Sequence, residues 1–115
     1  MASHEDWMRM ALIEARTAFD KGEVPVGAVM VRGDELVCTA HNRREAFQSP
    51  LSHAELDVIG EASRLLHTWR LSDCTLYVTL EPCLMCIGAA LQARLKRLVF
   101  GCRDPKAGAV RSLYH

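Results

Sequence analysis

A strand, a helix and a second strand follow one another late in the chain, and this order constrains the fold more than any other feature. Residues 75–80, Thr-Leu-Tyr-Val-Thr-Leu, have the composition of a buried strand. Pro82 stands where a first helical turn begins, residues 83–95 predict a helix, and residues 97–102 predict the next strand. Such a unit pairs its two strands in parallel through a right-handed crossover. The side chains of this helix predicted to face the core are Leu84, Ile87, Leu91 and Leu95.

A helix and a hairpin are predicted for the first part of the chain. Residues 5–21 predict the helix, because Ser3 and Asp6 resemble a capping pair and apolar residues recur at helical spacing. Residues 24–31 and 35–40 predict two antiparallel strands joined by a Gly-Asp turn. The residues of the first helix that recur at helical spacing are Met8, Leu12, Ala15 and Phe19, and Gly22 follows as a stop.

The hairpin and the strand–helix–strand unit are separated by a polar segment and another helix. Residues 41–52 predict a loop, residues 53–67 a helix, and residues 104–108 a final loop. One face of the helix over residues 53–67 carries Leu56, Ile59, Ala62 and Leu66. The order of elements predicts an α/β domain with a mixed sheet and helices on its faces.

Length and composition are those of one globular domain, residues 1–115. Half of the residues are apolar and 24% are charged, which excludes a disordered or collagen-like chain. No apolar run is long enough for a membrane helix. The first residues include acids where a secretory signal carries bases, which predicts a cytoplasmic protein with reduced thiols.

The charges are unevenly distributed although the net charge is zero. Residues 91–115 carry six bases and one acid, against eight bases and thirteen acids in the first ninety residues. A basic end of this kind could contact phosphates, or it could be an ordinary solvated face. Charge alone leaves both interpretations open.

Five cysteines, an odd number, argue against a complete disulfide framework. Cys83 and Cys86 form a Cys-x-x-Cys pair, which in a reduced environment indicates a metal site or a redox pair. Cys38, Cys74 and Cys102 lack such a placement and are predicted to be core residues.

A histidine and these two cysteines form a candidate metal site at the starts of two predicted helices. Cys83 and Cys86 are three residues apart, so their thiols share a helix face, and a helix N-terminus favours the thiolate. With His53 they supply three ligands, which is the number found in catalytic zinc sites that keep a fourth position for water. Glu55 could move protons for that water without binding the metal.

Structural interpretations of the same residues remain open. Ser52 and Glu55 match a helix capping box, which needs no catalysis. His53 alone could be an ordinary residue at a helix start. Cys83 and Cys86 alone could be a redox pair or two buried thiols.

The residues resemble a known family. His53-Ala54-Glu55 together with Pro82-Cys83-x-x-Cys86 matches the signature of the zinc-dependent nucleoside and nucleobase deaminases. Residues 23–29, 79–86 and 99–104 are similar to the bacterial tRNA adenosine deaminases, within the cytidine and deoxycytidylate deaminase superfamily. The resemblance extends over residues 7–113 and implies a three-layer α/β/α cytidine deaminase-like fold around the mixed sheet.

The resemblance also implies site residues, a cofactor and partners. One Zn²⁺ per chain, a tRNA anticodon loop or other single-stranded nucleic acid as partner, no membrane association and a homodimer are expected. His53, Cys83 and Cys86 match the zinc ligands, Glu55 the proton-shuttling glutamate, and Asn42, the backbone of Ala54 and Asp104 the contacts to the nucleoside. The implied reaction is hydrolytic deamination of adenosine to inosine at the anticodon wobble position.

The chain departs from the family pattern in two places. Family members usually continue with a further strand and helix, so the chain is expected to be shortened at its C-terminal end, with an exposed sheet edge and an uncovered apolar face. Ser49-Pro50 stands where Asp-Pro is common, and residues 43–47 differ from the usual loop, which could change the substrate. Deamination of cytosine, guanine or deoxyadenosine in single-stranded DNA, and a non-catalytic zinc module, remain alternatives.

Overall fold

The computed structural model describes residues 2–110, which form four strands and four helices. In chain order the elements are α1 (His4–Asp20), β1 (Gly27–Arg32), β2 (Glu35–His41), α2 (Arg44–Phe47), α3 (Ala54–Leu66), β3 (Cys74–Leu80), α4 (Leu84–Gln92) and β4 (Arg97–Cys102).

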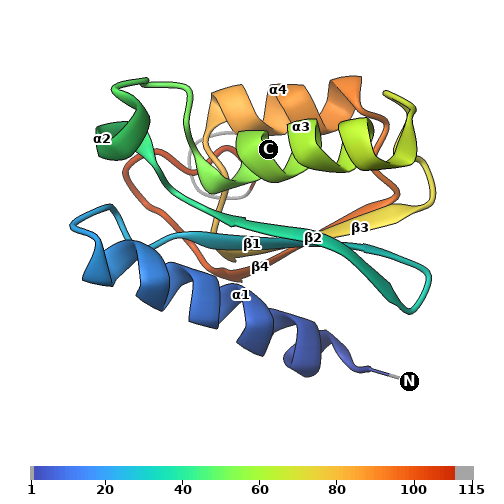
Figure 1. Ribbon diagram of the computed structural model, residues 1–115, viewed down its shortest axis with the longest axis horizontal. Helices are drawn as coiled ribbons and strands as arrows, with labels where there is room; N and C mark the ends of the chain where they lie inside the picture. The colour runs from blue at the N-terminus through green and yellow to red at the C-terminus, as the bar shows by residue number, and fades with distance from the viewer. Residues whose placement is uncertain (1, 111–115) are drawn as a thin grey trace.

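The four strands form one mixed sheet in the order β2-β1-β3-β4. β1 pairs antiparallel with β2 and β3, whereas β3 and β4 run parallel, with Leu76 opposite Leu98. The predicted hairpin and the predicted strand–helix–strand unit are both confirmed. α1 covers one face of the sheet, and α3 and α4 lie side by side on the other, which confirms the three-layer α/β/α fold (Figure 1).

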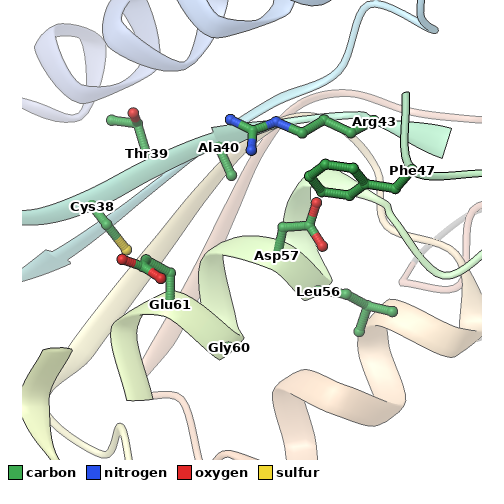
Figure 2. Close-up of a pocket in the computed structure, with 9 residues that line it drawn as sticks. All are labelled: Cys38, Thr39, Ala40, Arg43, Phe47, Leu56, Asp57, Gly60 and Glu61. Carbon is green, nitrogen blue, oxygen red and sulfur yellow. The ribbon is translucent and has the colours of Figure 1, made fainter. Parts of the chain in front are cut away.

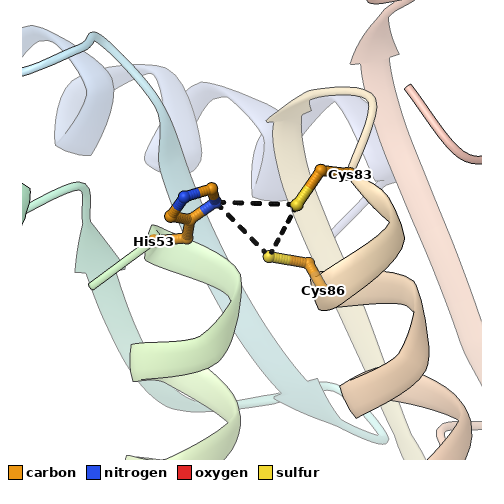
Figure 3. Close-up of side chains that lie close together, drawn as sticks. All are labelled: His53, Cys83 and Cys86. Atoms are coloured by element: carbon orange, nitrogen blue, oxygen red, sulfur yellow. Dashed lines mark hydrogen bonds between the residues drawn. The ribbon is translucent and has the colours of Figure 1, made fainter. Parts of the chain in front are cut away.

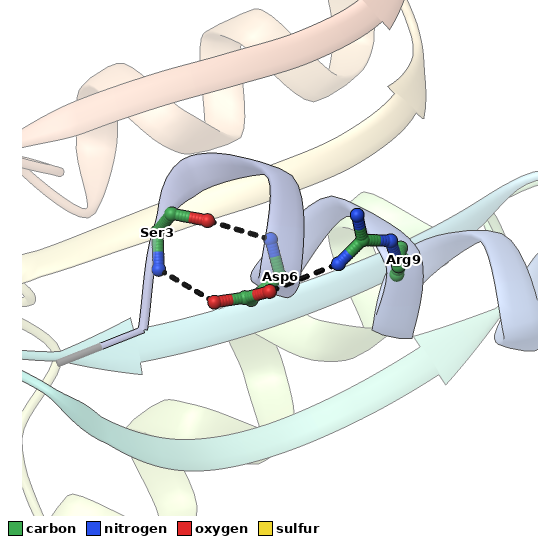
Figure 4. Close-up of polar contacts among 3 residues, drawn as sticks. All are labelled: Ser3, Asp6 and Arg9. Carbon is green, nitrogen blue, oxygen red and sulfur yellow. Dashed lines mark hydrogen bonds and ion pairs between the residues drawn. The ribbon is translucent and has the colours of Figure 1, made fainter.

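The first helix begins at the predicted cap. The backbone N–H of Asp6 donates to the Ser3 hydroxyl at 3.2 Å, and the Ser3 N–H donates to the Asp6 carboxylate at 2.9 Å (Figure 4). Arg9 adds an ion pair to Asp6 at 3.0 Å. This reciprocal capping box satisfies backbone donors that have no partner within the helix.

The helical spacing of Met8, Leu12, Ala15 and Phe19 matches the buried face of α1 only in part. Its buried side chains are Trp7, Ala11, Ala15 and Ala18, whereas Leu12 and Phe19 are 54% and 60% exposed. Short side chains face the sheet because the backbones approach closely here. A Cβ atom on Gly27 of β1 would lie 2.0 Å from the carbonyl oxygen of Ala11.

The same kind of correction applies to α4. Cys86 and Ala90 are buried, whereas Leu84 and Leu91 are 57% and 68% exposed, contrary to the prediction. The buried side chains of α4 are thus the short ones, whereas these two leucines are exposed. The helix also ends at Gln92, before the predicted end.

Smaller differences concern element bounds and the cysteines. β1 begins at Gly27, three residues later than predicted, and the predicted loop 41–52 contains the short helix α2. Cys74 is buried and Cys38 half-buried, but Cys102 is exposed, so its prediction as a core residue is wrong. Among residues 2–110, no helix has the length and apolar character needed to cross a membrane.

Candidate metal centre

The starts of α3 and α4 bring one imidazole and two thiols together (Figure 3). His53 is the residue before α3, Cys83 is the residue before α4, and Cys86 lies in the first turn of α4. His53 Nδ1 lies 3.8 Å from Cys83 Sγ and 3.6 Å from Cys86 Sγ, and the two sulfurs are 3.7 Å apart. Residues thirty positions apart in the chain thus meet at one point, as the sequence predicted.

These distances fit a tetrahedral ion. With about 2.3 Å from zinc to sulfur and about 2.0 Å from zinc to nitrogen, tetrahedral angles require about 3.8 Å between two sulfurs and about 3.5 Å between sulfur and nitrogen. The observed distances of 3.7, 3.6 and 3.8 Å agree with that geometry. Three protein ligands leave the fourth corner for water or substrate, which is the arrangement of catalytic zinc sites. An imidazole next to both sulfurs favours a metal site over a redox pair.

Burial changes the proton affinity of two of these groups. It lowers the pKa of His53, which favours the neutral imidazole that can bind a metal. It raises the pKa of the Cys86 thiol, and the nearby Glu55 and Cys83 raise it further. A metal cation at this point would supply the positive charge that the Cys86 thiolate needs.

Glu55 lies beside this group, in the first turn of α3. Its side chain is 4% exposed, and burial raises the pKa of its carboxyl, opposed by hydrogen bonding to its own backbone and to the Cys86 thiol. Among the described residues, the group that could hold a metal consists of His53, Cys83 and Cys86, so Glu55 is a neighbour and not a member.

The alternative interpretation of Glu55 as a helix cap is wrong. The residue at the N-cap of α3 is His53, and no side chain among the described residues caps this helix. The hydroxyl of Ser52 instead donates to the Asp57 carboxylate. Glu55 is therefore not occupied by the capping box that the sequence allowed.

A cavity of about 190 Å³ opens next to the candidate metal ligands. It brings Asn42 and Asp104, which lie far apart in the sequence, to the same hollow as Glu55. Ala54, the first residue of α3, is buried between two residues that line it, and its backbone N–H belongs to the helix start. The lining comprises Val24, Val26, Asn42, Arg44, His53, Glu55, Leu80, Glu81, Cys83, Asp104 and Ala107.

Hydrogen bonds orient the two polar residues at the rim. Asn42 is buried, and its Oδ1 accepts the backbone N–H of Arg44 at 3.0 Å, which fixes the orientation of its amide group. Asp104 Oδ1 accepts the N–H groups of Lys106 and Ala107 at 3.1 and 3.3 Å. One oxygen of the Asp104 carboxylate is thus used to shape its own loop.

Sequence reasoning missed several residues that line this cavity. Arg44 stands in the segment that departs from the family pattern, and its positive charge lowers the pKa of His53 in addition to the effect of burial. Glu81 stands next to the Pro-Cys-x-x-Cys motif and is 2% exposed. The sequence signal that could have identified Glu81 is its place directly before the Pro-Cys-x-x-Cys motif.

A larger hollow of about 560 Å³ lies elsewhere, between β2, α2 and α3 (Figure 2). Its lining includes Asp57 and Glu61 of α3 and the Arg43 guanidinium, which stacks on the Phe47 ring. None of the site residues predicted from the sequence lines it. Size alone therefore does not identify the site. The smaller cavity is favoured because His53, Glu55 and Cys83 line it.

Proteins with similar sequences are named as deaminases. The sequence pattern of the MafB19-like deaminase family matches residues 2–114. A tRNA-specific adenosine deaminase of Bacillus subtilis (strain 168) is 50% identical over 113 residues, which cover 98% of this chain and 70% of that relative.

Solved structures share the fold. A structure from studies of A-to-I editing by tRNA:A34 deaminases at the wobble position of transfer RNA superposes with a TM-score of 0.90 and 45% identity, covering 92% of this chain and 77% of that one. A guanine deaminase from Bacillus subtilis has a TM-score of 0.86 and 32% identity, covering 89% of this chain and 66% of that one.

Proposed function

The chain belongs to the family of tRNA-specific adenosine deaminases, and we propose on this basis that it converts adenosine to inosine at the wobble position of a tRNA anticodon. One observation carries the proposal: an imidazole and two thiols stand at tetrahedral ligand distances, with a buried carboxylate beside them. Residues 1–115 act in this proposal as a single deaminase domain.

His53, Cys83 and Cys86 would hold one Zn²⁺ per chain. Nitrogen and sulfur ligands in this number suit zinc better than magnesium or calcium, which prefer oxygen. When bound, zinc makes water a nucleophile at neutral pH. Deprotonated sulfur and neutral imidazole are the forms required of these side chains.

Glu55 would move the protons of the reaction. In hydrolytic deamination, the oxygen of water bonds to C6 of the purine and the bond from C6 to the amino nitrogen breaks. Glu55 takes a proton from the attacking water and delivers it to the departing nitrogen, which leaves as ammonia. Its buried position and raised pKa suit a group that must both take and return a proton.

Three further residues would hold the nucleoside. The amide nitrogen of Asn42 and the backbone N–H of Ala54 can donate hydrogen bonds, and the second oxygen of the Asp104 carboxylate can accept one from a ribose hydroxyl. All three stand at or next to the same cavity, which supports this assignment.

An RNA loop is the substrate that suits the cavity. A base must leave its stack to reach an enclosed site, and this costs less in a single-stranded loop than in a duplex. Arg94, Lys96, Arg97, Arg103 and Lys106 are all exposed and can meet phosphates. Arg111, the sixth base of this end, lies outside the described residues.

The proposal is tested by product analysis with four substrates: an anticodon stem-loop, a deoxyadenosine oligomer, cytidine and guanine. Inosine from the stem-loop at a far higher kcat/KM than product from the others supports it. The similarity to a guanine deaminase makes guanine the most informative competitor. Preferential conversion of guanine to xanthine would overturn the choice of substrate while leaving the reaction type intact.

The proposed assembly is a homodimer, and the proposed location is the cytoplasm, because tRNA is the proposed substrate. Leu84 and Leu91 expose large apolar side chains on α4, which is the kind of surface that association covers. Sedimentation equilibrium of the zinc-loaded chain would give the mass of a dimer. A concentration-independent monomer would contradict this part of the proposal.

A further inference from the structure

Two buried carboxylates, Glu23 and Glu81, each bind the backbone of one loop that lines the candidate site. Their side chains are 7% and 2% exposed. A buried carboxylate is costly unless hydrogen bonds compensate its charge, and backbone N–H groups make strong bonds to it. Neither residue belongs to the group that could hold the metal.

Glu81 connects both ends of the loop that carries Asp104. Its Oε1 accepts the backbone N–H of Asp104 at 3.1 Å, and its Oε2 accepts that of Val110 at 2.9 Å. Two backbone bonds close the same loop: Gly108 N–H to the Asp104 carbonyl and Ala109 N–H to the Pro82 carbonyl, both 2.8 Å. The loop is thereby fastened directly to the Pro-Cys-x-x-Cys segment.

Gly108 allows the loop to lie against this carboxylate. A Cβ atom at position 108 would stand 2.4 Å from the Glu81 carboxyl carbon and 2.7 Å from the Asp104 carbonyl oxygen. Any side chain there would force the loop away from Glu81. The loop and the carboxylate are therefore matched to each other.

Glu23 binds the backbone of the segment that follows Asn42 in the same way. Its Oε1 accepts the backbone N–H of Glu45 at 3.0 Å, and its Oε2 accepts that of Ala46 at 2.8 Å. These residues belong to α2, which follows Asn42 directly and begins with Arg44. Asn42 and Arg44 line the cavity, as Asp104 and Ala107 do.

We propose that Glu81 and Glu23 are positioning residues that set the two loop walls of the nucleoside cavity, Glu81 acting through Asp104 and Glu23 acting through Asn42. The proposal rests on the proposed deaminase function. Both carboxylates accept hydrogen bonds from backbone N–H groups of these segments. In the proposed role they act on substrate binding through the loops and take no part in proton transfer.

A double-mutant cycle tests the connection between Glu81 and Asp104. Glu81→Gln removes the charge but keeps the size of the side chain, and we expect it to raise KM for the anticodon stem-loop about tenfold, with kcat changed less than about threefold. Asp104→Ala is expected to raise KM by a similar factor alone, but by less than about threefold in the Glu81→Gln background.

Asn42→Ala provides the matched control. In the double variant with Glu81→Gln, the two effects on KM should multiply fully. In the double variant with Glu23→Gln they should not, because Glu23 positions the segment that carries Asn42. Fully multiplicative effects of Glu81→Gln and Asp104→Ala would overturn the proposal. If Glu81→Gln instead lowered kcat about tenfold and left KM unchanged, the proposal would also be overturned, because Glu81 would then act in the chemical step.

Two further measurements keep the proposal testable if Glu81→Gln folds poorly or the chain proves inactive on RNA. Gly108→Ala would push the same loop away from the Glu81 carboxylate and should raise KM without loss of metal. Hydrogen exchange should quicken at the N–H groups of Asp104 and Val110 in Glu81→Gln, but not in the exposed control Glu35→Gln. Inactivity of the wild type refutes the proposed function, whereas unchanged exchange at Asp104 and Val110 refutes the positioning role.

Discussion

The hydroxyl of Ser52 donates a hydrogen bond of 2.8 Å to the Asp57 carboxylate, five residues further along the chain. This contact decides between two interpretations of the segment before α3. The sequence allowed a capping box between Ser52 and Glu55, which would have given Glu55 a structural task. Because Ser52 binds Asp57, the buried Glu55 carboxylate stays beside the candidate metal ligands, available for proton transfer.

Glu55→Gln is expected to abolish deamination while zinc binding and folding remain. The amide has the shape of the carboxylate but cannot take a proton from water, and general acid–base groups contribute about 10²- to 10⁴-fold to rate. Zinc content by atomic absorption and inosine formation are measured on the same preparation. Loss of zinc in this variant would show instead that Glu55 is a ligand.

Removal of the metal is expected to lower stability as well as activity. A ligand that binds only the folded chain stabilises it, by about 2.7 kcal/mol when its concentration is roughly 100 times Kd. A chelator should therefore lower the Tm of the wild type, and added zinc should restore it. Cys86→Ser should lose this response and Cys102→Ser, at an exposed position, should keep it. An equal response in both variants would contradict the assigned ligands.

The architecture and the candidate metal ligands could be predicted from local patterns. The strand–helix–strand unit and the hairpin follow from composition and turn residues, and His53, Cys83 and Cys86 each stand at a helix start. The buried faces of α1 and α4 could not be predicted in this way. Hydrophobicity ranks Leu12 above Ala11 and Leu91 above Ala90, yet the alanines are the buried residues. For Ala11 the reason is the close approach of α1 to Gly27 of β1.

The contacts that position the two loops beside the cavity could not be predicted from the sequence either. Glu81 meets Asp104 and Val110, and Glu23 meets Ala46, across separations of more than twenty residues. No local sequence pattern links residues at such separations. Only the folded chain therefore shows from which N–H groups each carboxylate accepts hydrogen bonds.

Gly27→Ala is expected to destabilise the fold strongly. The added Cβ would lie 2.0 Å from the Ala11 carbonyl oxygen and 2.5 Å from the Ala15 nitrogen, so α1 would have to move off the sheet. Insertions of this kind into packed interiors cost about 1–3 kcal/mol or more. Gly60→Ala in α3 is the control, because its added Cβ would meet no described atom within 4 Å beyond its chain neighbours and the backbone of its own helix. Denaturant unfolding should show a loss for the first variant, and equal stabilities would contradict the packing of α1.

Stability is expected to fall at high pH because of two thiols. Burial raises the pKa of Cys38 and of Cys74 to about 11. The unfolded chain then loses these protons at lower pH than the folded chain, so the free energy of unfolding decreases as pH rises from about 9 to 11. Below that window these two thiols contribute no pH dependence, because they are protonated in both states.

The double variant Cys38→Ala, Cys74→Ala should show a shallower decrease than the wild type when urea unfolding is followed between pH 8 and 11. Cys102→Ala should follow the wild-type curve. Curves of the same slope for the double variant and the wild type would show that other groups cause the decrease.

Nucleoside analysis of an anticodon stem-loop after incubation with the zinc-loaded wild type and with Glu55→Gln at equal zinc content tests the central claim most directly. The proposed mechanism predicts inosine from the wild type and none above background from the variant. Inosine from both proteins at similar rates, or a wild-type protein that binds no zinc through its imidazole and paired thiols, would contradict it.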